Sequence, residues 1–317
     1  MENTTFIQKL RRHREAGLML ILFIMCMLLA FMTKSFLTSD NIFNVLKQAT
    51  LVAIIAIGQT YVIASGGIDL SVGYSMTLCS MILAYSLQAH IPVTIAILLG
   101  IMSSTAVGLA NGVLITSLGI PAFIITLGMQ NIVKGIILVM SKGYIVTLEN
   151  DFVYTIGQTD IGPVPIMVII LAVLMVIFIF ILDQTRFGNH VKAVGGNELA
   201  AELSGIRKNR IRIIVYVLAG ILCGIAGVII TGRLNGGNPN AAGTYDMDSI
   251  AAVIVGGTSM AGGSATIVGT LLGALLMILI RNGLVLLRVN MYWQTVAVGA
   301  VIIIVCAVDA ISQKRKN

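Results

Sequence analysis

This sequence has few charged residues. They make up 10% of the 317 residues, whereas soluble domains carry about 25%. Hydrophobic residues, in contrast, make up 57% of the chain. This balance excludes an ordinary soluble domain and predicts a polytopic membrane protein. We find no segment that resembles a soluble domain, so we expect one membrane domain over residues 1–317.

Cysteine and histidine are also scarce, and neither is grouped. The four cysteines lie inside apolar runs without metal-ligand spacing, which favours packing over disulfides: Cys26, Cys79, Cys223 and Cys306. The three histidines are scattered, and no Ser–His–Asp grouping or carboxylate pair accompanies them. A membrane enzyme needs such a polar cluster. We therefore predict no catalytic residues, no metal site and no cofactor bound by this chain.

Long apolar runs are what the chain has instead. Crossing a bilayer requires about 20 apolar residues. The first run follows basic residues, as in a signal peptide, but no small-residue cleavage site follows it, so we expect a retained helix. The eighth is too short to cross regularly and predicts a broken or re-entrant helix. The ten runs cover about 17–32, 42–63, 71–89, 92–116, 121–140, 164–182, 211–232, 249–260, 266–287 and 292–309.

Basic residues flank these runs and account for the net charge of +7. No aromatic surface accompanies them, so nucleic acid is not an expected partner. An even number of runs separates each basic cluster from the next, so the positive-inside rule places all three clusters and both termini in the cytoplasm. The acidic connections 141–163 and 233–248 then face outward. The clusters are Lys9, Arg11, Arg12 and Arg14; the basic residues of 183–212; and Lys314, Arg315 and Lys316.

One long polar interruption, residues 183–212, separates the sixth and seventh runs. Within it, Asn197 is a favourable N-cap, and Glu198 in the first turn suits the helix dipole. The alanines that follow favour helix, and Gly205 is a suitable stop. These residues predict a short helix near 197–204. They leave two interpretations open, an interfacial helix that joins two spans or a docking element for a partner.

Two glycines and an aspartate separate the second and third runs, in the sequence SGGIDLSVG, residues 65–73. Gly66 and Gly67 permit a sharp backbone break, and Asp69 or Ser71 can cap the next helix. The segment is either a capped turn or a helix break beside a transport pathway. An acidic group at membrane depth is costly and often functional. Asp69 and Ser71 are therefore candidate pathway residues.

A second glycine-rich segment, VGGTSMAGGSATIVG, covers residues 255–269. Its 257–264 part nearly matches a P-loop, but Gly263 occupies the position of the phosphate-binding lysine, so we do not expect nucleotide binding. We expect the glycines to let helices approach closely or the chain to reverse within the membrane. Close helix contacts are also predicted by three pairs of glycines four residues apart: Gly108/Gly112, Gly220/Gly224 and Gly269/Gly273.

Two cations, Lys134 and Arg281, lie within apolar runs. Gln130 shares a helix face with Lys134, Asn131 is adjacent to Gln130, and Asn282 follows Arg281. Each cation either extends to the outer interface or serves a polar interior. We keep all five residues as candidates for a translocation pathway.

Three motifs together resemble a known family. They are GIDLSVG at 67–73, AVGGNELAAELSGI at 193–206 and IAAVIVGGTSMAGG at 250–263. Their order is that of the permease subunits of bacterial ABC monosaccharide importers, with the ribose-importer permease most similar, and the resemblance extends from about residue 41 to 309. It implies an all-α, multi-pass permease with about ten transmembrane helices in the bacterial inner membrane.

The resemblance also implies partners and a coupling site. Two permease copies, or two related permeases, form the pathway in that family. A periplasmic sugar-binding protein docks outside, and a cytoplasmic ATPase that binds and hydrolyses ATP docks inside, so the permease is not an enzyme. The loop departs from the E-A-A-x-x-x-G pattern of other importer classes. The residues implied to couple to the ATPase are Gly196, Asn197, Glu198, Ala200, Ala201, Glu202, Ser204 and Gly205.

The resulting expectation is ATP-driven uptake of a monosaccharide, with ribose or another pentose first. Allose, galactose-type sugars, a furanose signalling molecule and a branched-chain amino acid are alternatives. Arg281 stands where asparagine is more frequent in ribose-type permeases. An ion-coupled secondary transporter is a rival from another class, but it needs paired charges deep in the spans and inverted repeats. Among deep charges only Asp69 and Lys134 are candidates, and no repeat is evident.

Overall fold

The computed structural model describes residues 2–148, 150–162 and 164–314, with side chains from Glu15 to Asn290 apart from these gaps and for part of the last helix. The structure is mostly helical. The helices are α1 (Glu2–Met32), α2 (Ser39–Ala64), α3 (Val72–Gln88), α4 (Val93–Leu118), α5 (Ala122–Ser141), α6 (Asp151–Gln158), α7 (Ile166–Gln184), α8 (Arg186–Gly196), α9 (Glu198–Leu203), α10 (Lys208–Leu234), α11 (Tyr245–Val255), α12 (Ile267–Leu286) and α13 (Met291–Lys314).

Four two-residue strands form two antiparallel pairs in the connections. They are β1 (Val146–Thr147) with β4 (Gly236–Gly237), and β2 (Asp160–Ile161) with β3 (Val164–Pro165). Several residues used in the sequence argument lie outside the described side chains: Lys9, Arg11, Arg12, Arg14, Cys306, Lys314, Arg315 and Lys316.

Each apolar run that the sequence contains overlaps a helix. Within the described part of the chain, seven helices are long and apolar enough to cross: α1, α2, α4, α5, α7, α10 and α12. The run expected near 249–260 is α11, which begins earlier and has 11 residues. It is about 16 Å long, roughly half of a hydrocarbon core. The expected broken segment therefore consists of α11 and the irregular residues 256–266.

The apolar runs do not predict α6 and α8, because both helices lie outside runs of membrane length. Each begins at a side-chain cap. Asn150 accepts a hydrogen bond from the Val153 N–H at 3.1 Å, and Thr185 accepts one from the Gly188 N–H at 3.3 Å. Short amphipathic helices that contain glycine lack a long apolar run, so a search for such runs does not find them.

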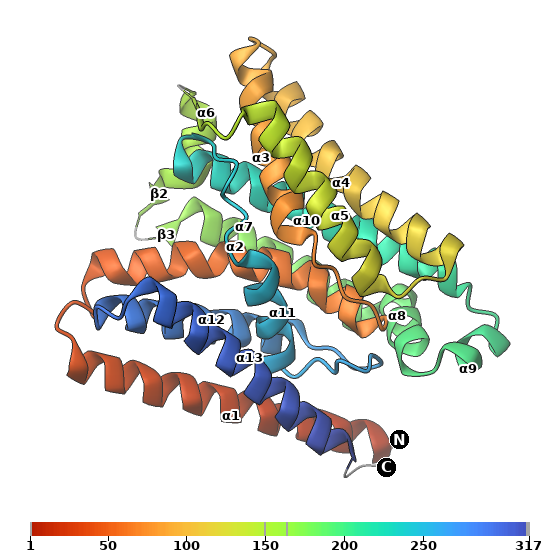
Figure 1. Cartoon of the computed structure of the whole chain (residues 1–317). Coiled ribbons are helices and arrows are strands. Elements are labelled where there is room, and N and C mark those ends of the chain that lie inside the picture. The colour runs from red at the N-terminus through yellow and green to blue at the C-terminus, as the bar shows by residue number, and fades with distance from the viewer. Residues whose placement is uncertain (1, 149, 163, 315–317) are drawn as a thin grey trace.

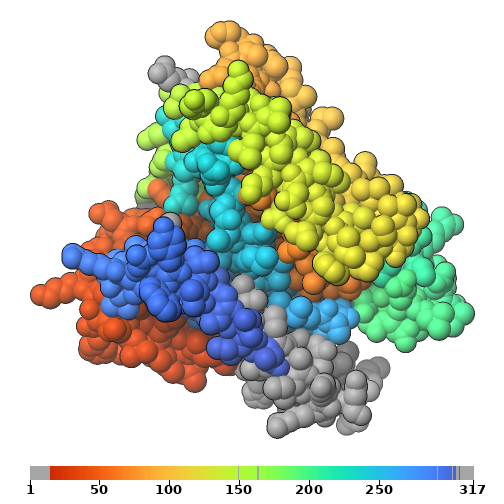
Figure 2. Space-filling view, in the orientation of Figure 1, coloured from red at the N-terminus to blue at the C-terminus, as the bar shows by residue number. Residues whose placement is uncertain are grey.

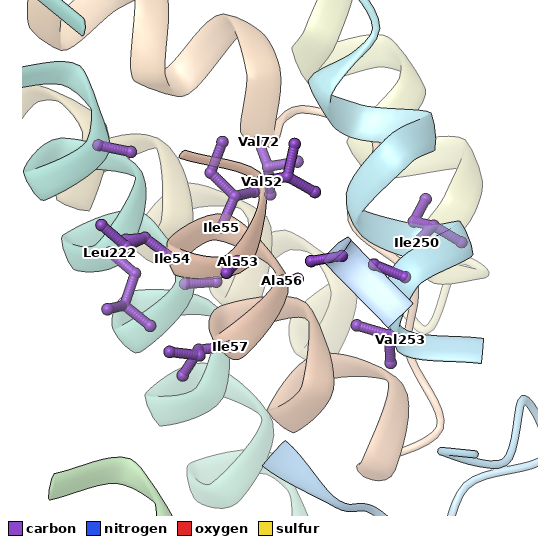
Figure 3. Close-up of a cluster of buried hydrophobic side chains, with 14 of the residues drawn as sticks. Val52, Ala53, Ile54, Ile55, Ala56, Ile57, Val72, Leu222, Ile250 and Val253 are labelled. Carbon is purple, nitrogen blue, oxygen red and sulfur yellow. The ribbon is translucent and has the colours of Figure 1, made fainter. Parts of the chain in front are cut away.

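Helices α2 and α10 form the centre of the bundle. α10 packs on α2, α3 and α4, and α2 also packs on α11 and α12. Figure 3 shows side chains of these elements packed together, among them Val52, Ile55, Leu222 and Val253. A helix buried on all sides is apolar on all sides, which is why residues 51–57 of α2 carry no polar side chain.

The three glycine pairs lie where helices touch. A Cβ on Gly108 of α4 would collide with the backbone of Tyr216 in α10, and one on Gly273 of α12 would collide with Ala252 in α11. The close contacts predicted from glycine spacing are therefore confirmed. A Cβ on any other member of the pairs would also lie within 2.9 Å of a facing segment: Gly112, Gly220, Gly224 and Gly269.

The two ends of the bundle carry different elements. Figure 1 shows α8 and α9 at one end, on the right, together with the start of α1 and the end of α13. The connection between α1 and α2, with β2 and β3, lies at the opposite end. In the space-filling view, the segment around residue 200 forms the right-hand edge of the molecule (Figure 2). We call the end with α9, which holds the residues expected to couple to a partner, the coupling end, and we call the other the far end.

Candidate functional site

The short helix α9 is the one that the capping pattern predicts. The Asn197 side chain accepts a hydrogen bond from the Ala200 N–H at 2.9 Å. At the other end, Gly205 has φ of +82°, and its N–H donates to the Glu202 carbonyl at 2.9 Å. Both ends of the helix therefore lie where the sequence places them.

Glu198 ties α9 to the start of α10. Its carboxylate accepts hydrogen bonds from both terminal nitrogens of Arg212, at 3.3 and 2.6 Å, and lies 3.0 Å from Lys208 Nζ. Lys208 also forms an ion pair with Glu202 at 2.8 Å. Hydrogen bonds from Arg212, and then from Lys208, lower the pKa of Glu198 below its ordinary value. The Glu198 carboxylate therefore serves the attachment of α9 to the bundle.

The outward face of α9 carries two exposed leucines. Leu199 is 67% exposed and Leu203 82% exposed, whereas Ala201 is 4% exposed. The two leucines are four residues apart, so they share one helix face. Ser204 lies at the end of the helix, where its hydroxyl donates to the Ala200 carbonyl at 2.9 Å. Two exposed leucines at the tip of the coupling end form a surface that a partner protein can cover.

Three segments that are distant in sequence meet through their backbones beside α9. The Ala64 carbonyl, at the end of α2, accepts a hydrogen bond from the Gly263 N–H at 3.0 Å. Gly195, near the end of α8, packs against both. A Cβ on Gly195 would collide with the Ala64 carbonyl oxygen and lie 2.9 Å from the Gly263 nitrogen. Gly196, one of the expected coupling residues, also lies against Gly263.

Residues 65–71 turn back into the bundle after α2. Gly66 has φ of +84°, and Asp69 is buried. The Asp69 carboxylate accepts hydrogen bonds from the Ser71 N–H at 2.8 Å and the Ser71 hydroxyl at 2.6 Å. Asn111 of α4 donates to the Ser71 hydroxyl at 2.9 Å. The structure thus brings Asp69 and Ser71 together, with Asp69 bonded to Ser71, the residue just before α3.

Other helices bond the backbone of the same segment. Gln59 of α2 donates to the Asp69 carbonyl. Thr126 of α5 and Tyr216 of α10 donate to the Ile68 carbonyl at 3.2 and 3.3 Å. Irregular backbone at membrane depth is tolerated where protein groups satisfy it. The sequence identifies the break but not these partners, because they come from other helices.

Arg281 is bonded within the bundle, at the junction of α11 and α12. Its Nη2 lies 2.9 Å from an oxygen of Asp248, whose side chain is 6% exposed. The same nitrogen donates to the Thr244 hydroxyl at 2.8 Å. Of the two interpretations of this cation, the polar interior contact is the one that the structure contains. Sequence reasoning missed Asp248 as its partner, since a helix separated by a loop supplies it.

Neighbouring amides extend this polar group toward α2. Asn282 donates to the Asn41 side chain at 2.7 Å, and Asn41 donates back at 3.2 Å. Gln130 of α5 donates to Asp246, in the first turn of α11, at 3.1 Å. Three of the expected pathway residues, Gln130, Arg281 and Asn282, are therefore in contact with α11 or with α2.

The remaining two pathway candidates lie apart from these contacts. Lys134 is exposed, with its ammonium group 5.8 Å from the centre of the Tyr74 ring, a distance that permits a cation–π interaction. Asn131 is exposed and donates to the Leu127 carbonyl of its own helix at 2.9 Å. The seven candidates therefore fall into two polar groups and two outlying residues. Gln59 and Asn111, single amides within apolar runs, are the missed residues that the sequence signals most clearly.

Comparison with known proteins gives the chain a family. Residues 41–306 match the family described as "Branched-chain amino acid transport system / permease component". The chain belongs to this permease family. The expected resemblance to the permeases of ABC sugar importers is confirmed as well, since the relatives described next include ribose import permeases.

Similarity to these relatives covers nearly all of the permease. The chain is 39% identical to the "Ribose import permease protein RbsC" of Bacillus subtilis strain 168, over 93% of this chain and 92% of that protein. It is 37% identical to the "Probable ABC transporter permease protein YphD" of Escherichia coli K12, over 98% and 94%. The "Galactose/methyl galactoside import permease protein MglC" of the same strain is 31% identical, over 96% of each chain. No solved structure matches the permease.

These findings assign the molecular class. The permease is an ABC-type transporter subunit of the membrane, a transport component and not a catalytic enzyme. Its motifs at 67–73, 193–206 and 250–263 all lie within the matched residues. In the structure, the last two motifs touch each other and the residues just before the first, through Gly195, Gly263 and Ala64.

Proposed function

We propose that this permease is the membrane subunit of an ATP-driven importer that carries a monosaccharide across the bacterial inner membrane. The observation that carries the proposal is the similarity, over more than nine-tenths of the chain, to permeases named for ribose import. Ribose is the first candidate substrate. Allose, galactose-type sugars, a furanose signalling molecule and a branched-chain amino acid are the alternatives.

The assembly we infer has three kinds of partner. A second permease, identical or related, completes the pathway; a periplasmic sugar-binding protein delivers the sugar; and a cytoplasmic ATPase binds and hydrolyses ATP. The far end faces the periplasm, and the coupling end, with both termini, faces the cytoplasm. Ten helices then cross or enter the membrane, with α11 as the half-length member. An even number of apolar runs separates each basic cluster from the next, and this supports the orientation.

Coupling to the ATPase is assigned to α9 and its flanking residues, 196–205. Glu198 and Ala201 face the bundle, so we assign them to holding the helix in place. The exposed Leu199 and Leu203 are the groups that enter the ATPase. Because Gly195 and Gly196 lie against Gly263, a movement of α9 is passed to residues 256–266 and on to α11. Asp69, Ser71, Gln130, Asn131, Lys134, Arg281 and Asn282 stay candidates for the pathway that this movement opens.

Transport by the purified complex tests the function. Vesicles containing the permease and its cognate ATPase, with ATP inside and the cognate binding protein outside, should accumulate labelled ribose, allose or galactose. Leucine is the matched non-sugar probe. Uptake of leucine and of none of the sugars would show that the substrate is an amino acid. Uptake that persists without ATP and follows an ion gradient would favour the rival secondary transporter and overturn the proposal.

The coupling surface has its own test. Leu199→Ala with Leu203→Ala should weaken co-purification with the ATPase about tenfold or more, since buried apolar anchors at interfaces contribute more than about 1 kcal/mol each. Alanine preserves the helix. Leu118→Ala, at an exposed leucine that ends α4, is the matched control. Equal co-purification of the double variant and the control would move the docking surface away from α9.

A further inference from the structure

The far end of the permease contains an open cavity of about 670 Å³ that none of the motifs explains. Four helices contribute to its walls: the first half of α2, the end of α6, the end of α10 and the first residue of α11. Pockets for small ligands typically measure about 300–1,000 Å³. Size alone therefore permits a small solute, and the lining decides which kind.

The lining is rich in planar polar side chains. Asn44 accepts hydrogen bonds from Gln48 at 3.0 Å and from Arg233 at 3.3 Å, and Gln158 donates to the Arg233 carbonyl at 2.6 Å. Amide side chains both donate and accept hydrogen bonds, and so does each hydroxyl group of a sugar. These contacts also fix the side chains in place before a ligand arrives, which lowers the entropic cost of binding.

The charges of the cavity cancel. Lys47 lies 3.3 Å from Asp160, and the other two charged residues of the lining are Asp40 and Arg233. Two cations and two anions leave no net charge, which disfavours an ionic ligand and suits a neutral one. The rings of Phe43 and Tyr245 add apolar faces, against which the C–H face of a sugar ring can pack.

The cavity also borders the start of α11, one residue before a polar contact between helices. Tyr245 is the first residue of α11, and the next residue, Asp246, accepts the hydrogen bond from Gln130. A ligand in the cavity therefore lies beside the start of α11. The C-terminal end of α11 continues into residues 256–266, which touch α8.

We propose that this cavity is an entry site that binds a neutral monosaccharide before it passes into the pathway, through the amides of Asn44, Gln48 and Gln158. The proposal rests on the proposed function, because that function supplies the substrate class and places the far end outside. It goes further in assigning the permease a sugar contact of its own.

Saturation-transfer NMR on the permease–ATPase complex in nanodiscs tests the site without the binding protein. Ribose, allose and galactose are titrated in turn, with leucine as the non-sugar probe. One sugar should give a saturable signal, and Gln48→Ala should weaken its binding about fivefold, the effect of one lost hydrogen bond. Gln48→Trp, which fills the cavity, should abolish the signal. Gln88→Ala makes the same change at the end of α3, outside the cavity lining, and should bind as the unaltered complex does.

Three results would overturn the inference. One is no saturable sugar signal from the unaltered complex. Another is a signal that Gln48→Ala and Gln48→Trp leave unchanged. A third is that the two Gln48 variants still bind sugar but no longer bind the periplasmic binding protein. The cavity would then be a contact surface for that protein. Uptake in vesicles separates this failure from that of the importer itself: a complex that still accumulates sugar retains the proposed function without this site.

Discussion

Residues 65–71 and residues 256–266 both interrupt the helical bundle, and their backbone groups are bonded in different ways. In 65–71, side chains from α2, α5 and α10 bond the carbonyls of Ile68 and Asp69. In 256–266, the backbone bonds described here are mostly local and link backbone to backbone, and the Gly263 N–H bonds the Ala64 carbonyl across the bundle.

The difference shows how the bundle meets one physical demand by two routes. Unsatisfied backbone groups at membrane depth are costly. A segment held by long side chains can keep its distance from the neighbouring helices. A segment held by backbone contact needs glycine, because any Cβ would separate the chains. The second route makes the contact rigid and intolerant of substitution, which suits a junction between α8 and the bundle.

The largest expected effect comes from Gly195→Ala. The new Cβ would strike the backbone of Ala64 and Gly263, and backbone cannot move aside as a flexible side chain does. We expect a loss of about 3 kcal/mol and of ATP-driven uptake. Thermal unfolding in detergent and vesicle uptake measure the two effects. Gly128→Ala in α5, where nothing lies within 4 Å of the new Cβ, is the control and should be neutral or slightly stabilising.

Asp69→Ala should have the next largest effect. It removes the acceptor of the Ser71 N–H and hydroxyl and leaves a buried donor unsatisfied, which costs about 1–3 kcal/mol. The backbone bond from Gln59 to residue 69 is retained in this variant. Thermal unfolding of Asp69→Ala and of Asp69→Asn distinguishes the causes, since asparagine keeps an acceptor oxygen. Equal losses in the two variants would show that the charge, not the hydrogen bonds, matters.

A double substitution tests the side-chain hydrogen bonds that hold residues 65–71. Thr126→Val and Tyr216→Phe each remove one of the two donors to the Ile68 carbonyl, and each should cost about 1 kcal/mol or less. The pair should cost more than the sum, because the carbonyl then loses both. Unfolding free energies of the two single variants and the double variant complete the cycle. Strict additivity would mean that water or another group replaces the lost donors.

The smallest effect is expected at the exposed attachment of α9. There, ion pairs hold the segment, in place of the side-chain hydrogen bonds of 65–71 and the backbone contacts of 256–266. Arg212 and Lys208 hold the pKa of Glu198 below its ordinary value. The attachment is therefore fully present above that ordinary value and is lost as the pH falls through the lowered pKa. Between pH 8 and pH 6, amide exchange of α9 should be protected to the same degree. Glu198→Gln should reduce protection by under about 1 kcal/mol, since the pair is exposed. A marked pH dependence in this range would point to another titrating group.

Local patterns predict α9 in full and α11 in part. For α9, the cap at Asn197 and the stop at Gly205 are both encoded within a few residues. For α11, the sequence predicts a short segment but places its start four residues late, because Tyr245–Asp248 looks like part of a polar loop. Asp248 enters the helix since Arg281, 33 residues later, neutralises it.

The sequence by itself determines the membrane class, the apolar runs, the caps of α9 and the family, because composition, periodicity and motif order are local properties. The tertiary structure alone decides which groups face each other. It bonds Glu198 to Arg212 while the leucines point outward, pairs Arg281 with Asp248, bonds residues 65–71 from several helices, and forms an open polar cavity at the far end. These outcomes depend on how helices that are distant in the chain are placed, and no stretch of sequence contains that information.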